Sequence, residues 1–215
     1  MPQNFFLKGE PKSGKTTALK EIAQELKKQG FKVGGFISPE EKKSGSRTAF
    51  DVIDLENGKV AKLADINGSG PKVGKYKVDV KSFESLAIPI MKKADKYDVM
   101  IIDEIGVMEL KSAKFQDELD NLIEMDMPLI ATVHPQAIDK YSAFGEVLEI
   151  TDRNRNEIVK QLKEKVVKIN KTMKKQMPNQ KAKIKPPLKS ATAARKNETK
   201  PKKGFFEWLK SLFGL

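Results

Sequence analysis

The sequence predicts an α/β protein with a mainly parallel sheet, helices on both faces and an antiparallel hairpin at one edge. Short apolar strands alternate with amphipathic helices up to about residue 167, which is typical of a parallel sheet. The pair Asn57-Gly58 separates two strand-like runs and favours a tight hairpin turn. The length of 215 residues allows one such domain and a tail.

Six strands and four helices are expected in this segment. The runs at 97–103 and 128–134 have continuously apolar centres at 99–102 and 128–131, as in strands that are buried on both faces. The first helix is expected to stop at Gly30, and the last has apolar residues at helical spacing. The expected strands are 4–8, 31–38, 48–55, 59–64, 97–103 and 128–134, and the expected helices are 15–29, 82–94, 112–125 and 152–167.

The net charge of +12 belongs to one part of the chain. Residues 168–204 hold thirteen of the 41 basic residues and one of the 29 acidic residues, so 28 of each remain elsewhere. This segment has few large apolar side chains and cannot bury enough surface to offset its ordering entropy. We therefore expect a domain over 1–167, a disordered basic linker over 168–204 and an amphipathic helix over 205–215.

Composition excludes several kinds of chemistry. The chain has no cysteine, so disulfides, thiol catalysis and cysteine-based zinc sites are excluded. The single histidine, His134, excludes a multi-histidine metal site. The N-terminus shows no secretory signal and no apolar stretch is long enough to span a bilayer. We expect a cytoplasmic protein.

A phosphate-binding loop follows the first strand. The pattern G-x-x-x-x-G-K-[ST] is met at every fixed position by Gly9, Glu10, Pro11, Lys12, Ser13, Gly14, Lys15 and Thr16. Backbone N–H groups of such a loop, and the helix N-terminus that follows, point at phosphate oxygens. Lys15 places a charge at the β- and γ-phosphates, and Thr16 offers a hydroxyl to Mg²⁺, the expected cofactor. Thr17 completes the expected nucleotide-binding set.

Two carboxylates end a buried strand. Asp103 and Glu104 follow the apolar run of 99–102, and the carboxyl end of a parallel strand lies beside the phosphate loop. Asp103 is expected to hold Mg²⁺. Glu104 is expected to orient and deprotonate a water that attacks the γ-phosphate. The competing interpretation is a solvated strand end, where acidic residues are common.

Two other functions remain open at this stage. A nucleoside or nucleotide kinase shares the phosphate loop but needs an acceptor pocket and an arginine-rich lid. The domain has only three arginines, Arg47, Arg153 and Arg155, which is few for such a lid. A nucleotide-binding switch protein, with the tail as its output, is the third hypothesis.

Five stretches of the chain carry a family resemblance. In order they are GEPKSGKTT, GFISPEEKKSGSRTAFDVIDL, KVGKYKVDVKSFESLAIP, DVMIIDEIGVMEL and ITDRNRNEI. Over residues 1 to about 165 the sequence resembles the thermophile/human cancer-related nucleoside-triphosphatase family. The resemblance implies a RecA-like P-loop fold and slow, Mg²⁺-dependent conversion of several NTPs, ATP and GTP among them, to NDP and phosphate. By position it makes Lys15 and Thr16 ligands of phosphate and Mg²⁺, and Asp103 and Glu104 the acidic pair.

One segment departs from the family pattern. The family usually has an arginine where this chain has Lys42, and paired glycines where it has Ser44-Gly45, whereas Arg47 is retained. Lysine lacks the planar fork of arginine. We therefore expect Glu104, Lys15 and Arg47 to be the catalytic residues, with a solvated charge as the competing interpretation of Arg47.

Three further residues are weaker candidates. Thr132 and His134 end an apolar strand, where a sensor of the γ-phosphate would lie. A structural histidine is the commoner alternative. Glu109 is a candidate second acid near the metal.

The last residues suggest a partner of their own. In 205–215, Phe205, Trp208, Leu209 and Leu212 share one helical face. An aromatic amphipathic helix after a polybasic segment suits an anionic membrane surface. The alternatives are a groove on a partner protein, folding back onto the domain, and nucleic-acid binding through 168–204, which is not favoured. Membrane binding would place the protein at the inner face of the membrane.

Overall fold

The computed structural model describes residues 3–39 and 48–176. Within them, nine strands form one sheet in the order β5–β6–β4–β3–β2–β7–β8–β1–β9. The strands are β1 (Asn4–Lys8), β2 (Val33–Ile37), β3 (Ala49–Asp54), β4 (Val60–Asp65), β5 (Lys72–Val73), β6 (Tyr76–Val78), β7 (Val99–Ile105), β8 (Leu129–Val133) and β9 (Glu146–Glu149).

The described helices alternate with these strands. The α-helices are α1 (Lys15–Lys28), α2 (Val80–Met91), α3 (Ala113–Glu124), α4 (Ile138–Tyr141) and α5 (Arg155–Gln176). Short 3₁₀ turns are η1 (Ala94–Lys96), η2 (Glu109–Lys111), η3 (Pro135–Ala137) and η4 (Ser142–Phe144). None of these helices is both long and apolar enough to cross a membrane.

The sheet has a parallel part and an antiparallel part. Strands β2, β7, β8, β1 and β9 run parallel, and β3, β4, β6 and β5 extend the β2 edge in antiparallel fashion. The β3–β4 pair is the hairpin expected across Asn57-Gly58. The fold-class prediction is therefore confirmed, although the antiparallel excursion contains four strands rather than two.

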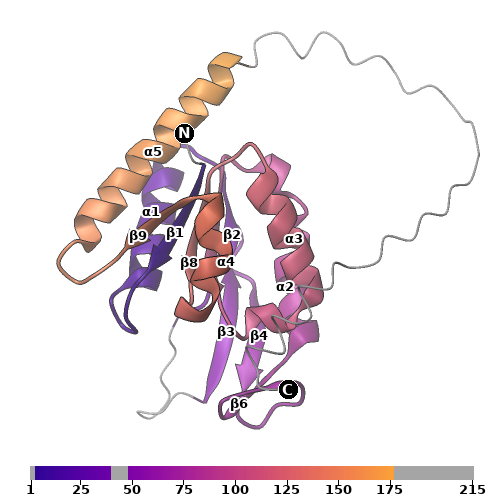
Figure 1. Ribbon diagram of the computed structural model, residues 1–215. Helices are drawn as coiled ribbons and strands as arrows, with labels where there is room; N and C mark the ends of the chain where they lie inside the picture. Colours follow the sequence, from indigo (N-terminus) through magenta and orange to yellow (C-terminus); the bar gives the residue numbers. More distant parts are fainter. Residues whose placement is uncertain (1–2, 40–47, 177–215) are drawn as a thin grey trace, which may run out of the picture. The chain divides into compact units, whose positions relative to one another are not determined.

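Helices cover both faces of the sheet. Figure 1 shows α1 and α5 on one side and α2 and α3 on the other. Alternate residues of a strand point to opposite faces of the sheet and pack in two separate hydrophobic cores. Phe5 and Leu7 pack with α1 and α5, whereas Phe6 packs with α2 and α3. The period of two along a strand produces this division.

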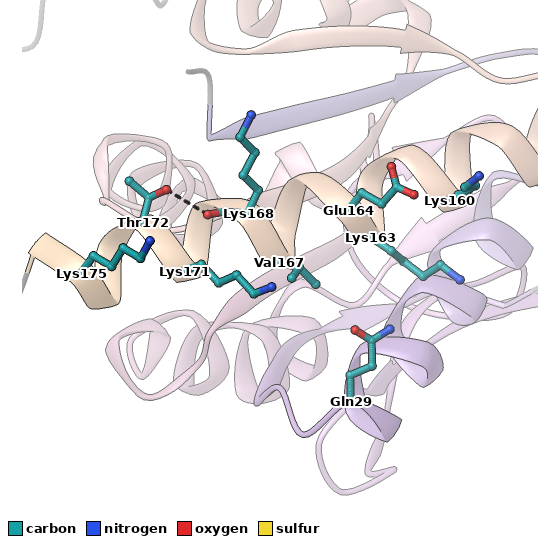
Figure 2. A pocket seen from close by; sticks show the side chains of 9 residues that line it. All are labelled: Gln29, Lys160, Lys163, Glu164, Val167, Lys168, Lys171, Thr172 and Lys175. Atoms are coloured by element: carbon teal, nitrogen blue, oxygen red, sulfur yellow. Dashed lines mark hydrogen bonds between the residues drawn. The ribbon is translucent and has the colours of Figure 1, made fainter.

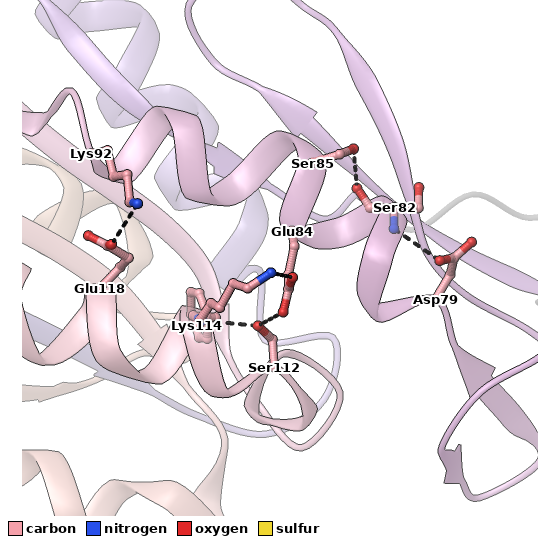
Figure 3. A network of polar contacts seen from close by, with 9 residues as sticks. Asp79, Ser82, Glu84, Ser85, Lys92, Ser112, Lys114 and Glu118 are labelled. Atoms are coloured by element: carbon pink, nitrogen blue, oxygen red, sulfur yellow. Dashed lines mark hydrogen bonds and ion pairs between the residues drawn. The ribbon is translucent and has the colours of Figure 1, made fainter.

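Polar contacts fix α2 against the segment that precedes α3. Ser112 Oγ accepts the Phe115 N–H at 3.0 Å and so caps α3. The same hydroxyl donates to Glu84 of α2 at 2.8 Å, and Lys114 also donates to Glu84 at 2.8 Å (Figure 3). These contacts anchor the turn η2, which carries Glu109.

The last described helix is longer than expected. The sequence pattern predicts a helix that ends at residue 167 and a linker from 168, but α5 continues to Gln176. Ile169 and Asn170 are buried, and the Asn170 side chain donates to the Asp98 carbonyl at 3.0 Å. Residues 168–176 therefore belong to the helix rather than to a disordered linker, because their apolar residues continue the helical spacing. The rest of the expected linker and the helix expected over 205–215 lie outside the described residues.

Candidate active site

The phosphate loop joins β1 to α1. Gly14 is the N-cap of α1 with φ of +85°, and no side chain caps the helix. The first-turn N–H groups are therefore available to an anion. The Lys15 ammonium donates to the carbonyls of Gly9 at 2.8 Å and Glu10 at 3.0 Å, so it bends back over the loop. Glu10, Pro11, Lys12 and Thr17 are exposed, and Ser13 is buried.

Asp103 lies directly beside this loop. The Thr16 hydroxyl donates to Asp103 Oδ2 at 2.6 Å, and the Thr132 hydroxyl donates to Oδ1 at 2.6 Å. The Ser38 N–H is 3.4 Å from Oδ2. Asp103 is only 3% exposed, and this burial raises the pKa of its carboxyl, an effect that the hydrogen bonds and the charge of Lys15 oppose.

A bulge in β7 directs the acidic pair. Ile102 pairs with Ala131 and Ile105 pairs with Val133, so Asp103 and Glu104 together stand opposite the single residue Thr132. Bulges of this kind re-aim side chains. The bulge lies at the carboxyl end of β7, so two consecutive carboxylates stand at the edge of the sheet beside the phosphate loop.

Glu104 and Glu109 lie close together. A Cβ atom placed on Gly106 would be 2.6 Å from Glu104 Oε1 and 2.8 Å from Glu109 Oε2, so the two carboxyl groups flank this glycine. Burial, and then the charge of Asp103, raise the pKa of Glu104 to about 7. Burial and the charge of Glu104 raise the pKa of Glu109 well above its ordinary value.

His134 directly follows β8 and is the N-cap of η3. Its Nδ1 accepts the Gln136 N–H at 3.3 Å. Burial, and then the nearby charge of Lys15, lower the pKa of the imidazole, which favours its neutral form. The two candidate sensors of the γ-phosphate therefore differ in their interactions. The Thr132 hydroxyl donates to Asp103, whereas the His134 imidazole is influenced by the charge of Lys15.

Two features of the site were not predicted from the sequence. Ser38, directly after β2, directs its N–H at Asp103, and among the described residues its buried hydroxyl has no hydrogen-bond partner. The only sequence signal for it is a polar residue at the carboxyl end of a strand. The contact of Thr132 with Asp103 also joins residues 29 positions apart, which no local pattern could show. The segment with Lys42, Ser44, Gly45 and Arg47 lies outside the described residues.

The arrangement defines a class of protein. An uncapped helix N-terminus with a lysine forms an anion site, and a hydroxyl–carboxylate pair beside it supplies the oxygen ligands that Mg²⁺ prefers. No group of three or more His, Cys, Asp or Glu side chains within residues 3–39 and 48–176 could form a metal cage. A metal here would share its ligands with phosphate, as in P-loop nucleotide-binding proteins. The strand order, with β8 between β1 and β7, is that of the RecA-like group.

Comparison with known proteins identifies the family. The sequence model of a family described as NTPase matches residues 4–163. The nucleoside-triphosphatase THEP1 of Pyrococcus abyssi is 40% identical over 166 residues, which cover 77% of this chain and 93% of that protein. The protein of the same name from Methanocaldococcus jannaschii is 38% identical over 164 residues, covering 76% of this chain and 96% of that protein. The chain belongs to this nucleoside-triphosphatase family.

Solved structures agree with this assignment. The crystal structure of THEP1 from Aquifex aeolicus is 32% identical, with a TM-score of 0.64 over 74% of this chain and 96% of that one. The solution structure of a human cancer-related nucleoside triphosphatase is 30% identical, with a TM-score of 0.64 over 75% of this chain and 95% of that one. The family resemblance and the RecA-like P-loop fold expected from the sequence are thereby confirmed.

Proposed function

We propose that this enzyme hydrolyses nucleoside triphosphates, ATP and GTP among them, to the diphosphate and phosphate in a Mg²⁺-dependent reaction with loose base preference. The observation that carries the proposal is the contact of Thr16 with Asp103 at 2.6 Å, directly before Glu104 on the same strand. A metal-binding pair and an adjacent carboxylate favour activation of water over transfer to another acceptor.

The residues of the loop bind and orient the substrate. The N–H groups of the first turn of α1 and the Lys15 ammonium bind the β- and γ-phosphates, and Lys15 leaves its loop carbonyls to do so. Thr16 and Asp103 fit Mg²⁺, because a hydroxyl and a buried carboxylate lie 2.6 Å apart and both offer oxygen. The bound metal would neutralise charge that develops on the phosphates.

Glu104 is the proposed general base. It is partly buried next to Asp103, and its pKa of about 7 matches the value at which a carboxylate accepts a proton efficiently near neutral pH. It would hold the attacking water by a hydrogen bond and take its proton as the water oxygen bonds to the γ-phosphorus. The bond from that phosphorus to the β–γ bridging oxygen breaks in the same reaction, and the diphosphate leaves. Arg47 is the proposed stabiliser of the transferred phosphate.

Phosphate release tests the reaction. Full-length protein is incubated with Mg²⁺ and each NTP, with and without nucleosides, and free phosphate is measured against phosphorylated nucleoside. Release that persists without acceptor and disappears in Glu104→Gln supports hydrolysis. Glu124→Gln, an exposed position on α3, is the matched control. Transfer that requires the acceptor would overturn hydrolysis in favour of a kinase.

We propose a second property, attachment to an anionic membrane surface at its cytoplasmic face. A groove of about 680 Å³ between the end of α1 and α5 is lined by Lys160, Lys163, Lys168, Lys171 and Lys175, with Glu164 as its acid (Figure 2). These lysines extend the basic character of residues 177–204 onto the described domain. Each lysine near such a surface contributes about 1 kcal/mol.

Vesicle sedimentation tests this second property. We compare the full chain, residues 1–203 and the double variant Lys163→Gln/Lys171→Gln on vesicles of neutral and of anionic lipid. The proposal is supported if the full chain sediments with anionic vesicles and not with neutral ones, and if truncation to 1–203 and the double variant each weaken this sedimentation. The control is Lys81→Gln/Lys93→Gln, which removes one exposed charge from α2 and one from the residue before η1. Equal sedimentation of all forms refutes it, and salt-sensitive binding of RNA or DNA without vesicle binding would favour nucleic acid instead.

A further inference from the structure

The side chain of Arg155 lies against the phosphate loop. A Cβ atom on Gly14 would be 2.8 Å from one guanidinium nitrogen of Arg155 and 3.0 Å from its Cδ. Gly14 combines this close approach with a left-handed backbone, which only glycine adopts without strain. Arg155 begins α5, 141 positions further along the chain, so the contact is a product of the tertiary fold.

The connection between β9 and α5 holds Arg155 in this position. The Ile150 N–H donates to the Lys8 carbonyl at 2.8 Å, at the point where β1 enters the loop. Thr151 and Asn154 exchange two hydrogen bonds, since the Thr151 N–H donates to Asn154 Oδ1 at 2.7 Å and the Asn154 N–H donates to Thr151 Oγ1 at 3.3 Å. The Asn154 amide also donates to the Glu149 carbonyl at 2.9 Å. The arginine is therefore presented by an ordered turn that packs on the loop.

Within residues 3–39 and 48–176, the Arg155 guanidinium is not paired with an anion. Among the residues that the structure describes, no carboxylate forms an ion pair with Arg155 and no acceptor takes a hydrogen bond from its side chain. It is only partly exposed, and it lies at the same helix N-terminus as Lys15. Two cations and a helix N-terminus at one loop form a site that favours binding of an anion.

The sheet order shows from which side Arg155 approaches. Strands β8 and then β7, with Glu104, lie on one side of β1, whereas β9 and the start of α5 lie on the other. In the proposed function, on which this step rests, the γ-phosphate faces Glu104. The opposite end of the phosphate chain, with the α-phosphate and the nucleoside, then faces Arg155.

We propose that Arg155 is a nucleotide-binding residue that contacts the α-phosphate of NTP and NDP alike. The contact is to charge, so it does not distinguish the bases. It acts on binding of substrate and product and not on the attack at the γ-phosphate. Arginine suits this role because its planar fork can give two parallel hydrogen bonds to phosphate oxygens.

Calorimetric titration of the full chain with ADP, GDP and UDP tests the proposal without any need for hydrolysis. Arg155→Ala should raise the dissociation constant of each by about tenfold or more, the usual effect of a charge-assisted hydrogen bond. Arg155→Lys should recover part of the loss. The control Arg153→Ala removes an exposed charge from the same connection and should bind like the unchanged protein. Thermal unfolding of each variant verifies that the fold is retained.

Steady-state phosphate release gives a second readout. The structure predicts that Arg155→Ala raises KM by a similar factor and changes kcat less than about threefold, because binding is lost equally from ground state and transition state. Unchanged ADP affinity would overturn the proposal, as would a loss that falls on kcat alone or a loss seen with purines and absent with UDP. If the unchanged protein releases no phosphate yet binds ADP through Arg155, the proposed hydrolysis fails and this inference stands.

Discussion

Substitution of Glu104 by glutamine should strongly lower the activity of the enzyme and, in the ligand-free protein at alkaline pH, raise the free energy of unfolding. Burial and the charge of Asp103 raise the pKa of Glu104 from 4.5 to about 7. At about 1.4 kcal/mol for each pH unit, ionising this carboxyl in the folded state costs about 3 kcal/mol relative to the unfolded chain. Glutamine has nearly the same shape and never ionises, so it removes that cost.

The sign of the pH dependence follows from the raised pKa. Below pH 4.5 the carboxyl is protonated in both states, and stability is lost as the pH rises through about 7. The variant should therefore gain about 3 kcal/mol over the unchanged protein at about pH 8.5, and less than about 1 kcal/mol at about pH 5. For a chain of this size the larger gain is a rise in Tm of roughly 6–12 °C.

Denaturant or thermal unfolding in the presence of a chelator measures this gain at both pH values. Glu124→Gln, on the exposed face of α3, controls for the general effect of removing one negative charge. A gain that is equal at the two pH values, or a loss at the alkaline one, would refute the assignment of a destabilising buried charge to Glu104. In parallel, kcat should fall about 100-fold or more, and the rise of kcat/KM with pH near 7 should be absent from the variant.

Three further outcomes follow from the structure. Thr132→Val keeps the buried volume but leaves Asp103 Oδ1 without its donor at 2.6 Å, so it should lower the free energy of unfolding by about 2 kcal/mol, measured in denaturant near pH 8. Glu109→Gln mimics the protonated carboxyl that its raised pKa favours, so hydrolysis should persist while Tm near pH 9 rises; loss of hydrolysis with an unchanged Tm would contradict this. A chain that ends at residue 167 should unfold about 3 kcal/mol more easily than one that ends at Gln176, because it loses buried Ile169 and the hydrogen bond from Asn170 to Asp98.

The sequence predicts the parts of this protein that depend on local pattern. The loop from Gly9 to Thr16 has a fixed spacing, and the apolar run before Asp103 marks a buried strand. Together they indicate the parallel sheet and the edge at which loop and carboxylates meet. The phosphate loop and the buried strand can each be predicted from one short stretch of chain. The loop depends on the spacing of its residues, and the strand depends on a local run of apolar side chains.

Other features depend on partners distant in the chain. Strand β9 is four residues long and partly exposed, and its identity as a strand comes from pairing with β1. The contact of Arg155 with Gly14 likewise has no local signature. The prediction that the last helix ends at residue 167 is wrong for a different reason. The many lysines after that residue indicate a disordered linker, whereas Ile169 and Met173 continue the apolar spacing of the helix. Net charge describes the solvent face of that helix and says little about the buried one.

The length of α5 separates two ends of the molecule. With 22 residues at about 1.5 Å of rise each, the helix extends about 33 Å from Arg155, on the phosphate loop, to Gln176. Gln176, the last described residue, therefore lies far from the phosphate loop along this helix. A group attached at Gln176 would be about 33 Å from the loop and need not cover it.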